Sequence, residues 1–382
     1  MASIPGPRTF GQAEIPPFNP PLPLTKHTQV NINKNFNHKN SASFKEIKGA
    51  TWKVQRGDGS SASGKVGYDV LTIGGLTIKE QAIQLAAAPD PQFSHGTMDG
   101  MMGLAFRKLN TIHFEGKPFP HATPAENAWR QEDIPIEAGV FTYAMYSTRD
   151  PDGDKSFYTF GWIDRYLVQQ SGAEIAWTAL NEASGLWMFP SERATVGGTP
   201  VPRPGNKAIA DSGTALVLLS DDVCRELYAQ IRGAEYSERD QGYTVPRDIT
   251  LDELPDLSVA VGGTEFAIQK QDLVFAPLDE NRWYGGVQSR GENTFDILGD
   301  TFLKSIYAVS LVLFLCSVFT TNPVGLTDLG QGQPALRRGA QDGQDAKRRA
   351  QRAAHGDTPA RDRGREDFCQ VGLWRHLVGV SC

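Results

Sequence analysis

The sequence predicts an all-β (mainly β) protein with two domains. Its 382 residues are enough for two domains that each bury a sizeable core. Its 39 glycines and 24 prolines separate many short runs of Val, Ile, Leu and Phe, a composition typical of strands joined by turns. A third observation is residues 208–219, where Asp211, Ser212, Gly213 and Thr214 lie between two apolar runs. We expect two buried strands there, joined by a tight turn.

Asp211 is the first candidate for chemistry. Gly213 permits a sharp turn that a side chain would resist, so the turn would hold Asp211 at the centre of a core. A carboxylate there loses hydration, and its pKa rises unless donors or charges oppose the rise. General acid–base catalysis uses such an environment. An ordinary turn between strands has the same composition, so these residues alone leave both interpretations open.

Charge and composition exclude several classes of function. The net charge of −6 and the isoelectric point near 5.7 argue against a nucleic-acid partner. The seven histidines show no metal-ligand spacing, and the Gly-x-Ser-x-Gly motif of serine hydrolases is absent, so we expect no metal and no cofactor. Four cysteines do not make a disulfide framework in a chain of this length: Cys224, Cys316, Cys369 and Cys382.

The first and last segments are unlike the middle. Residues 1–40 are proline-rich and then Asn/Lys-rich, and we leave them unassigned as an extended linker or tail. They contain no apolar stretch of the kind a secretory signal needs, so either this is an incomplete precursor or the protein stays inside the cell. The apolar run 306–319 has 14 residues, against roughly 20 for a membrane span, so we expect a buried strand and no membrane partner. Residues 335–366 mix basic and acidic side chains, which predicts a solvated tail.

Two further local patterns are clear. Residues 51–55 alternate as a strand, the Asp-Gly pair within 56–60 indicates a hairpin turn, and 61–68 lead into the returning strand. Residues 220–231 begin with a serine N-cap and early acids and continue with apolar residues at helical spacing, which predicts a helix.

Several motifs together resemble the pepsin-like aspartic proteases, in particular the fungal aspergillopepsin/penicillopepsin-like branch. Residues 52–64 read Trp-Lys-Val-Gln-Arg-Gly-Asp-Gly-Ser-Ser-Ala-Ser-Gly, nearly identical to the flap of those enzymes. The Asp211 stretch resembles the family's second active-site loop, apolar-apolar-Asp-Thr/Ser-Gly-Thr. Further matches are residues 98–106, 157–164, 185–189 and 295–309.

The resemblance implies a bilobal pepsin-like fold with an incomplete N-terminal lobe. It places the first lobe at 41–164 and the second at 165–309, and leaves 310–382 as an unassigned, disordered tail that lacks the family's final strand. Asp99 and Asp300 are structural acids in that comparison. One disulfide usual in fungal relatives is missing, since its matching positions hold Arg247 and Trp283.

The resemblance also implies a reaction and a set of site residues. Two aspartates, one from each lobe, share a proton and activate a water that attacks a peptide bond at acidic pH. Asp211 would be the second-lobe catalytic acid, and Ser212 would brace the paired loop. Expected substrate contacts come from the Asp211 loop and from the flap: Ser212, Gly213, Thr214, Arg56, Gly57 and Asp58. We expect a peptide or unfolded-protein substrate, a monomer, and by family a secreted or vacuolar location.

The first-lobe aspartate is missing. No aspartate precedes Asp58, and the only acids before it are Glu14 and Glu46, neither of which lies beside a glycine between apolar strands. Arg56 stands where the family usually has a flap tyrosine. We therefore predict little or no proteolytic activity.

Two explanations of the missing aspartate compete. We favour a misread coding sequence that lost the first active-site segment and the last strand. The alternative is a non-catalytic relative that binds a peptide or a protein partner in the cleft. An in-frame Asp-Thr-Gly-Ser in the transcript just upstream of Ser41 would decide for the first.

Overall fold

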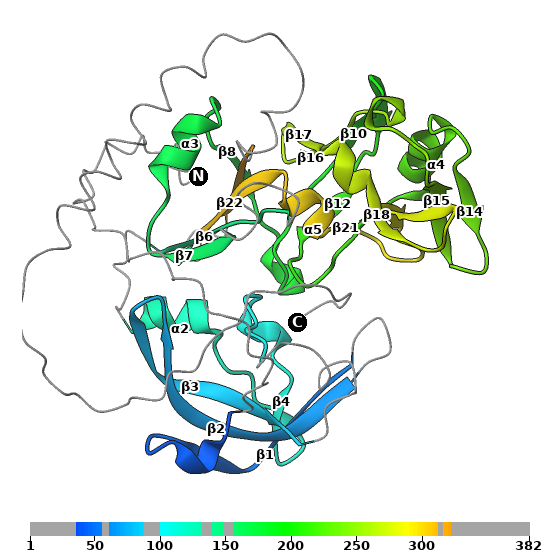
Figure 1. The fold of residues 1–382 in the computed structure, drawn as a ribbon. Helices are drawn as coiled ribbons and strands as arrows, with labels where there is room; N and C mark the ends of the chain where they lie inside the picture. Colours follow the sequence, from blue (N-terminus) through cyan, green and yellow to red (C-terminus); the bar gives the residue numbers. More distant parts are fainter. Residues whose placement is uncertain are drawn as a thin grey trace, which may run out of the picture. The chain divides into compact units, whose positions relative to one another are not determined.

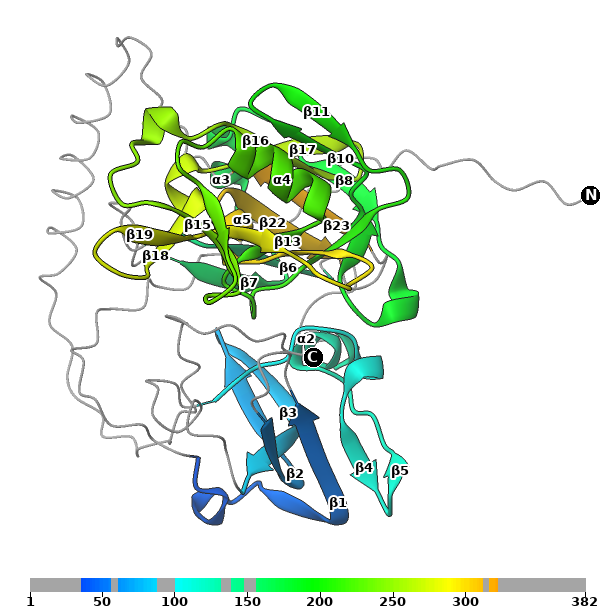
Figure 2. The same cartoon turned by 90° about the vertical axis from the view of Figure 1, so that its right-hand side faces the viewer.

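The computed structural model describes residues 36–55, 61–87, 100–131, 139–147, 156–311 and 316–321. All of them lie within one compact unit, Asn33–Cys382, and strands dominate it (Figures 1 and 2). None of the helices in these ranges has the length and apolar character needed to cross a bilayer. The α-helices described are α2 (Pro124–Arg130), α3 (Arg165–Gln170), α4 (Asp221–Ala229) and α5 (Asp300–Leu303).

Five strands in the order β3-β2-β1-β4-β5 form the first sheet, here called sheet A. Gly74 and Gly75, with φ of 55° and 88°, form the turn that joins β2 to β3. Such positive φ values favour glycine. The predicted flap turn, residues 56–60, lies outside the described residues. The strands are β1 (Lys45–Gln55), β2 (Ser61–Ile73), β3 (Leu76–Ala86), β4 (Ile112–Phe114) and β5 (Lys117–Pro118).

Sheet B has the order β7-β6-β22-β23-β8 and corrects one prediction. We expected a disordered tail from residue 310, but β22 runs to Leu311 and β23 then pairs antiparallel with both β22 and β8. The apolar run 306–319 is long enough for most of two adjacent strands, and its composition does not show where the first one ends. The strands are β6 (Val140–Ala144), β7 (Phe157–Phe160), β8 (Ala176–Ala179), β22 (Ile306–Leu311) and β23 (Cys316–Thr321).

Sheet C carries the Asp211 turn and has the order β20-β13-β21-β12-β9. Its two central strands, β12 and β21, run parallel, and Ala210 is opposite Leu298. The predicted helix is confirmed as α4, with Ser220 at its N-cap position, although the serine side chain makes no capping hydrogen bond. The strands are β9 (Met188–Pro190), β12 (Lys207–Ala210), β13 (Val217–Leu219), β20 (Val287–Ser289) and β21 (Asp296–Leu298).

Two four-stranded sheets complete the second half of the chain. Sheet D has the order β11-β10-β16-β17, with strands β10 (Arg193–Val196), β11 (Thr199–Pro202), β16 (Leu257–Val261) and β17 (Thr264–Ile268). Sheet E has the order β14-β15-β19-β18, with strands β14 (Glu235–Ser237), β15 (Gly242–Pro246), β18 (Val274–Pro277) and β19 (Arg282–Gly285). Beside sheet E the guanidinium of Arg247 lies 4.0 Å from the ring centre of Trp283, so these two residues are in contact at the positions where the resemblance implies a disulfide in fungal relatives.

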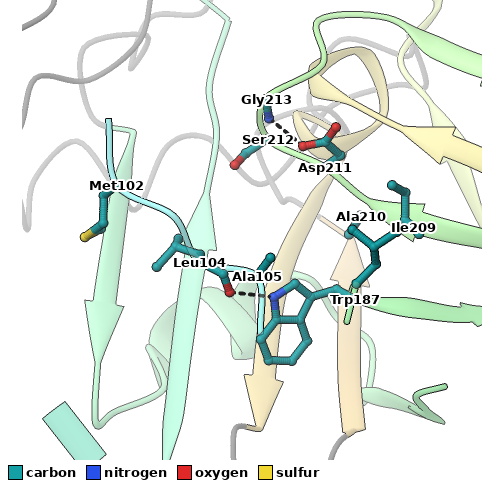
Figure 3. A pocket seen from close by; sticks show the side chains of 10 residues that line it. Met102, Leu104, Ala105, Trp187, Ile209, Ala210, Asp211, Ser212 and Gly213 are labelled. Atoms are coloured by element: carbon teal, nitrogen blue, oxygen red, sulfur yellow. Dashed lines mark hydrogen bonds between the residues drawn. The ribbon is translucent and has the colours of Figure 1, made fainter. Parts of the chain in front are cut away.

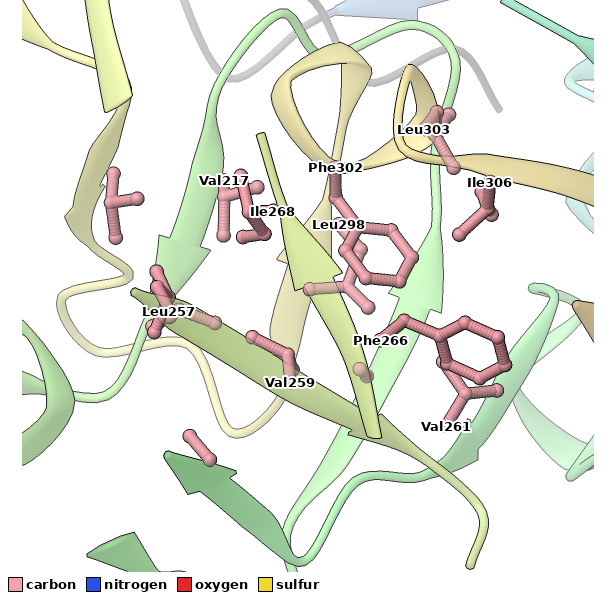
Figure 4. Packing of buried hydrophobic residues seen from close by; sticks show 14 of the residues in the cluster. Val217, Leu257, Val259, Val261, Phe266, Ile268, Leu298, Phe302, Leu303 and Ile306 are labelled. Carbon is pink, nitrogen blue, oxygen red and sulfur yellow. The ribbon is translucent and has the colours of Figure 1, made fainter. Parts of the chain in front are cut away.

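Two separate hydrophobic clusters distinguish the halves of the chain. The larger one gathers side chains from sheets B, C, D and E, and Figure 4 shows Phe302, Leu298 and Phe266 at its centre. A smaller one in sheet A is built around Trp52 and Ile112. The boundary between lobes at residue 164 remains a prediction, because sheet B takes strands from both sides of it.

Candidate active site around Asp211

Asp211 sits at the end of β12, in the turn that leads to β13. The flanking strands are buried as predicted, since Ala208 and Val217 are fully inaccessible to solvent. The backbone N–H of Asp211 donates to the carbonyl of Leu298 on the parallel strand β21, at 3.1 Å. Asp211 therefore lies where two neighbouring parallel strands of sheet C, β12 and β21, end.

The Asp211 carboxylate is held by its own turn. The side chain is 9% exposed, and both oxygens accept hydrogen bonds. The Gly213 N–H donates to Oδ1 at 2.9 Å, and the Thr214 hydroxyl donates to Oδ2 at 2.7 Å. Burial therefore leaves neither oxygen unsatisfied, as expected of a polar group at the edge of a core.

A pocket of about 60 Å³ opens beside this turn. One wall is the turn itself, and the others are apolar (Figure 3). Among the ten residues that line the pocket, Asp211 is the only acid. The lining residues are Met102, Leu104, Ala105, Leu186, Trp187, Ile209, Ala210, Asp211, Ser212 and Gly213.

Trp187 fixes the apolar wall. Its indole N–H donates to the carbonyl of Leu104 at 2.8 Å, and its ring packs against Phe106 and Phe141 at centroid distances of 4.6 and 5.1 Å. The backbone N–H of Phe106 also donates to the carbonyl of Gly185 at 3.1 Å. These contacts join the two motifs that we noted at 98–106 and 185–189, which the sequence alone did not connect.

Two tyrosines of sheet B lie close to the Asp211 turn. Tyr143 and Tyr158 are directly opposite each other on β6 and β7, with ring centroids 5.5 Å apart. Burial raises the pKa of Tyr158 to about 12, with the charges of Asp300 and Asp211 adding to the rise. Burial also raises the pKa of Tyr143, and Tyr158 and Asp211 add to that rise. Sequence analysis missed both tyrosines.

Asp300 supports the turn through its backbone. Its N–H donates to the carbonyl of Thr214 at 2.7 Å, and the Thr301 hydroxyl donates to the carbonyl of Ala215 at 3.0 Å. Gly299 passes so close that a Cβ there would lie 2.1 Å from the Thr214 carbonyl oxygen. These contacts are made by the backbone, so the structural role expected of the Asp300 carboxylate stays a prediction.

A buried ionic cluster lies at the other end of the same strands. Asp296 on β21 is fully buried and pairs with Arg203 and with Arg290, whose N–O distance is 2.7 Å. Asn206 donates to Asp296 at 2.8 Å. Burial raises the pKa of Asp296 and lowers that of Arg203, so desolvation outweighs their mutual attraction. The cluster ties β21 to the start of β12, which carries Asp211.

The other predicted contacts fall into three groups. Ser212 and Gly213 line the pocket, whereas Thr214 does not, and its hydroxyl serves Asp211. A direct contact of Thr214 with substrate stays a prediction. The flap contacts Arg56, Gly57 and Asp58 lie outside the described residues, as does Asp99. Within the described ranges, no three His, Cys, Asp or Glu side chains are grouped to hold a metal, and Cys224 is buried and unbridged.

The chain matches known proteins in both sequence and structure. The family model of the eukaryotic aspartyl proteases matches residues 21–311. The chain belongs to the eukaryotic aspartyl protease family. This match confirms the resemblance and begins 20 residues before the segment on which we based it, residue 41.

Fungal members of the aspartyl protease family are similar to the chain. Aspergillopepsin-1 of Aspergillus fumigatus is 35% identical over 275 residues, which cover 71% of this chain and 65% of that protein. Penicillopepsin-1 of Talaromyces stipitatus is 35% identical over 266 residues, which cover 69% of this chain and 63% of that protein. The chain thus spans slightly less than two thirds of the length of these relatives.

A solved structure confirms the fold class. The crystal structure of an aspartic proteinase from Irpex lacteus superposes with a TM-score of 0.64, at 20% sequence identity. The superposition covers 78% of this chain and 88% of that one. The predicted bilobal, all-β pepsin-like fold is therefore confirmed.

Proposed function

We propose that this chain is a peptide-binding member of the aspartyl protease family that hydrolyses peptide bonds little or not at all. The observation that carries the proposal is that Asp211 is the only acid among the described residues of the pocket lining, while no aspartate precedes Asp58 in the sequence. Two adjacent carboxylates cannot both ionise, so one acts as base toward water while the other donates to the scissile carbonyl. A lone carboxylate cannot perform both tasks at once.

The only described acid before the flap does not replace the missing partner. Glu46 lies on β1, and its carboxylate pairs with the ammonium of Lys65 at 3.1 Å. Both side chains are exposed. An exposed, paired carboxylate has neither the low-dielectric surroundings nor the shared proton that the reaction needs.

Peptide binding is supported by the pocket itself. Leu104, Leu186 and Trp187 offer an apolar wall for a substrate side chain, and Ser212 and Gly213 line the pocket beside Asp211. Such a combination of apolar surface with a few polar groups is typical of ligand sites. The expected occupant is an extended segment of a peptide or an unfolded protein.

A cleavage assay tests the loss of hydrolysis. We expect no release of fragments from fluorescently labelled, unfolded casein at acidic pH above the level given by Asp211→Asn. An acid-dependent cleavage that Asp211→Asn abolishes would overturn the proposal and favour an active endopeptidase. Glu46→Gln is the matched control, because it removes a carboxylate without touching the pocket.

Peptide affinity separates binding from hydrolysis. Fluorescence anisotropy with a labelled peptide that has apolar residues at its centre should show saturable binding by the wild-type chain. Binding should survive Asp211→Asn, since the apolar walls remain. Replacing Leu186 by aspartate should weaken binding, because it places a charge in the apolar wall. Equal affinity in all three proteins would show that the peptide binds elsewhere.

A further inference from the structure

We infer that the side chain of Gln131 closes the outer edge of sheet A to pairing with a second copy of this chain. The edge strand β3 is 11 residues long, whereas β5 at the opposite edge has only two residues. The unpaired N–H and C=O groups of a long edge strand are a template for pairing with another chain. A second copy offers the same strand, so such pairing would be symmetric. β3 is therefore the edge that needs protection.

Gln131 gives Lys79 on β3 the two hydrogen bonds that a neighbouring strand would give. The Lys79 N–H donates to Gln131 Oε1 at 2.8 Å, and Gln131 Nε2 donates to the Lys79 carbonyl at 2.7 Å. In an antiparallel pair, two opposite residues exchange the same two kinds of bond. A carboxamide carries an acceptor and a donor side by side, so it satisfies this backbone position as a strand would.

β3 is irregular at the same place. Two of its residues, Lys79 and Glu80, lie opposite the single residue Val70 of β2, which makes a β-bulge. Glu80 has φ of 51°, a conformation that residues other than glycine rarely adopt. Bulges are one of the features by which edge strands avoid pairing with other chains. The bulge and the Gln131 carboxamide thus act at one point of the edge.

Helix α2 holds Gln131 at this point. Gln131 is the C-cap residue of the helix, and its backbone N–H donates to the carbonyl of Asn127 at 2.9 Å. The Asn127 side chain donates to the buried Gln81 side chain of β3 at 2.9 Å, and Gln81 in turn donates to the carbonyl of Ala122 at 3.2 Å. Asn127 and Gln131 are four residues apart, the spacing that puts two side chains on one helix face. Two amides of α2 therefore bind β3, one through a side chain and one through the backbone.

The surface around the Gln131–Lys79 contact is open to solvent. Both side chains are exposed, and together with Thr77 and Glu80 they line a hollow of about 470 Å³. A strand that approached Lys79 would have to displace the carboxamide before it could form the same two bonds. Lys79 is itself a charged residue of the kind that blunts edge strands. It is present in every variant below, so the comparison isolates the carboxamide.

The first test compares two amide side chains of the same helix. Gln131→Ala uncovers the Lys79 backbone, whereas Asn127→Ala removes an amide and leaves both Lys79 bonds in place. Sedimentation velocity over a range of concentrations should show Gln131→Ala associating about tenfold more tightly than the wild type, the change expected when two backbone hydrogen bonds become available to a partner. Asn127→Ala should sediment as the wild type does. Unchanged association of Gln131→Ala, or equal association of both variants, would overturn the inference.

Amide hydrogen exchange reads the edge without any association. At low concentration the Lys79 amide should exchange about fivefold faster in Gln131→Ala than in Asn127→Ala, the change expected for loss of one hydrogen bond. Gln131→Glu should restore most of this protection at neutral pH, because a carboxylate still accepts from the Lys79 N–H. Equal Lys79 exchange in the two alanine variants would show that Gln131 does not cover the edge, and the inference would fail.

Discussion

Sheet A and sheet C are both built from buried alternating strands with glycines at close contacts, yet only sheet C presents an acid to the pocket, among the residues described. In sheet A the buried residues Trp52 and Ile112 form a small cluster of their own. In sheet C the buried strands β12 and β13 belong to the large core and enclose Asp211 between them. The second half of the chain thus holds a buried acid in a turn beside the pocket, whereas the described part of the first half lines the pocket without a carboxylate.

Substitutions that create a cavity in each core would show whether the two cores unfold independently. Phe302→Ala should cost about 3–5 kcal/mol, and Ile112→Ala about 2–5 kcal/mol, since both side chains are fully buried. Site-resolved hydrogen exchange should show Phe302→Ala loosening sheet C and Ile112→Ala loosening sheet A. If Ile112→Ala loosens β12 as much as β1, the two regions form one cooperative core and the comparison fails.

The buried ion pair under the Asp211 strand should be almost as important. Arg203→Met leaves Asp296 buried with one partner fewer, which should cost about 3–5 kcal/mol in urea unfolding. Arg225→Met, which removes an exposed ion pair with Asp222, is the control and should change stability by less than about 1 kcal/mol. Similar effects from both would mean that the cluster does not anchor sheet C.

Close backbone packing behind the turn gives a third test. Gly299→Ala would set a Cβ within 2.1 Å of the Thr214 carbonyl oxygen, so the turn must shift, at a cost of about 1–3 kcal/mol. Gly263→Ala meets no atom within 4 Å and should be nearly neutral. Thermal unfolding measures both. A neutral Gly299→Ala would show that this close packing does not constrain the Asp211 turn.

The contact between Arg247 and Trp283 should contribute modestly to stability. Arg247→Ala removes a guanidinium that lies 4.0 Å from the Trp283 ring centre, and should cost about 0.5–1 kcal/mol. Arg247→Lys keeps a cation and should recover part of the loss. Identical urea unfolding of the three proteins would show that this contact does not stabilise the second half of the chain.

The smallest effect concerns a surface acid. The Arg232 side chain, with help from Thr250, lowers the pKa of Glu253 from 4.5 to about 2. Because the folded pKa is the lower one, the stabilisation is complete above pH 4.5 and is lost as the pH falls through 2. Carboxyl NMR should find this midpoint, and Arg232→Gln should raise it. A midpoint near the ordinary value in both proteins would contradict the contact.

Turns and helices that depend on neighbouring residues could be predicted from local sequence patterns. The Asp211 turn between buried strands and helix α4 were both predicted in place, because apolar periodicity and turn residues determine them. The end of β22 was predicted wrongly, since a continuous apolar run does not show where one strand stops.

Contacts between distant segments could not be predicted. Arg203 and Asp296 are 93 residues apart, and neither lies in a motif that marks it for pairing. Tyr158 lies within a matched segment, but its ring meets the Tyr143 ring only because β6 pairs with β7. Such contacts depend on which sheets meet, and strand patterns leave that open.

The most direct test of the proposal that Asp211 lacks a partner aspartate is whether a bound peptide stays intact. A labelled peptide with an apolar centre is held with the wild-type chain at acidic pH, and the bound fraction is analysed by mass spectrometry. We predict that the bound peptide is recovered intact. Recovery of two fragments, with intact peptide recovered from Asp211→Asn, would contradict the account.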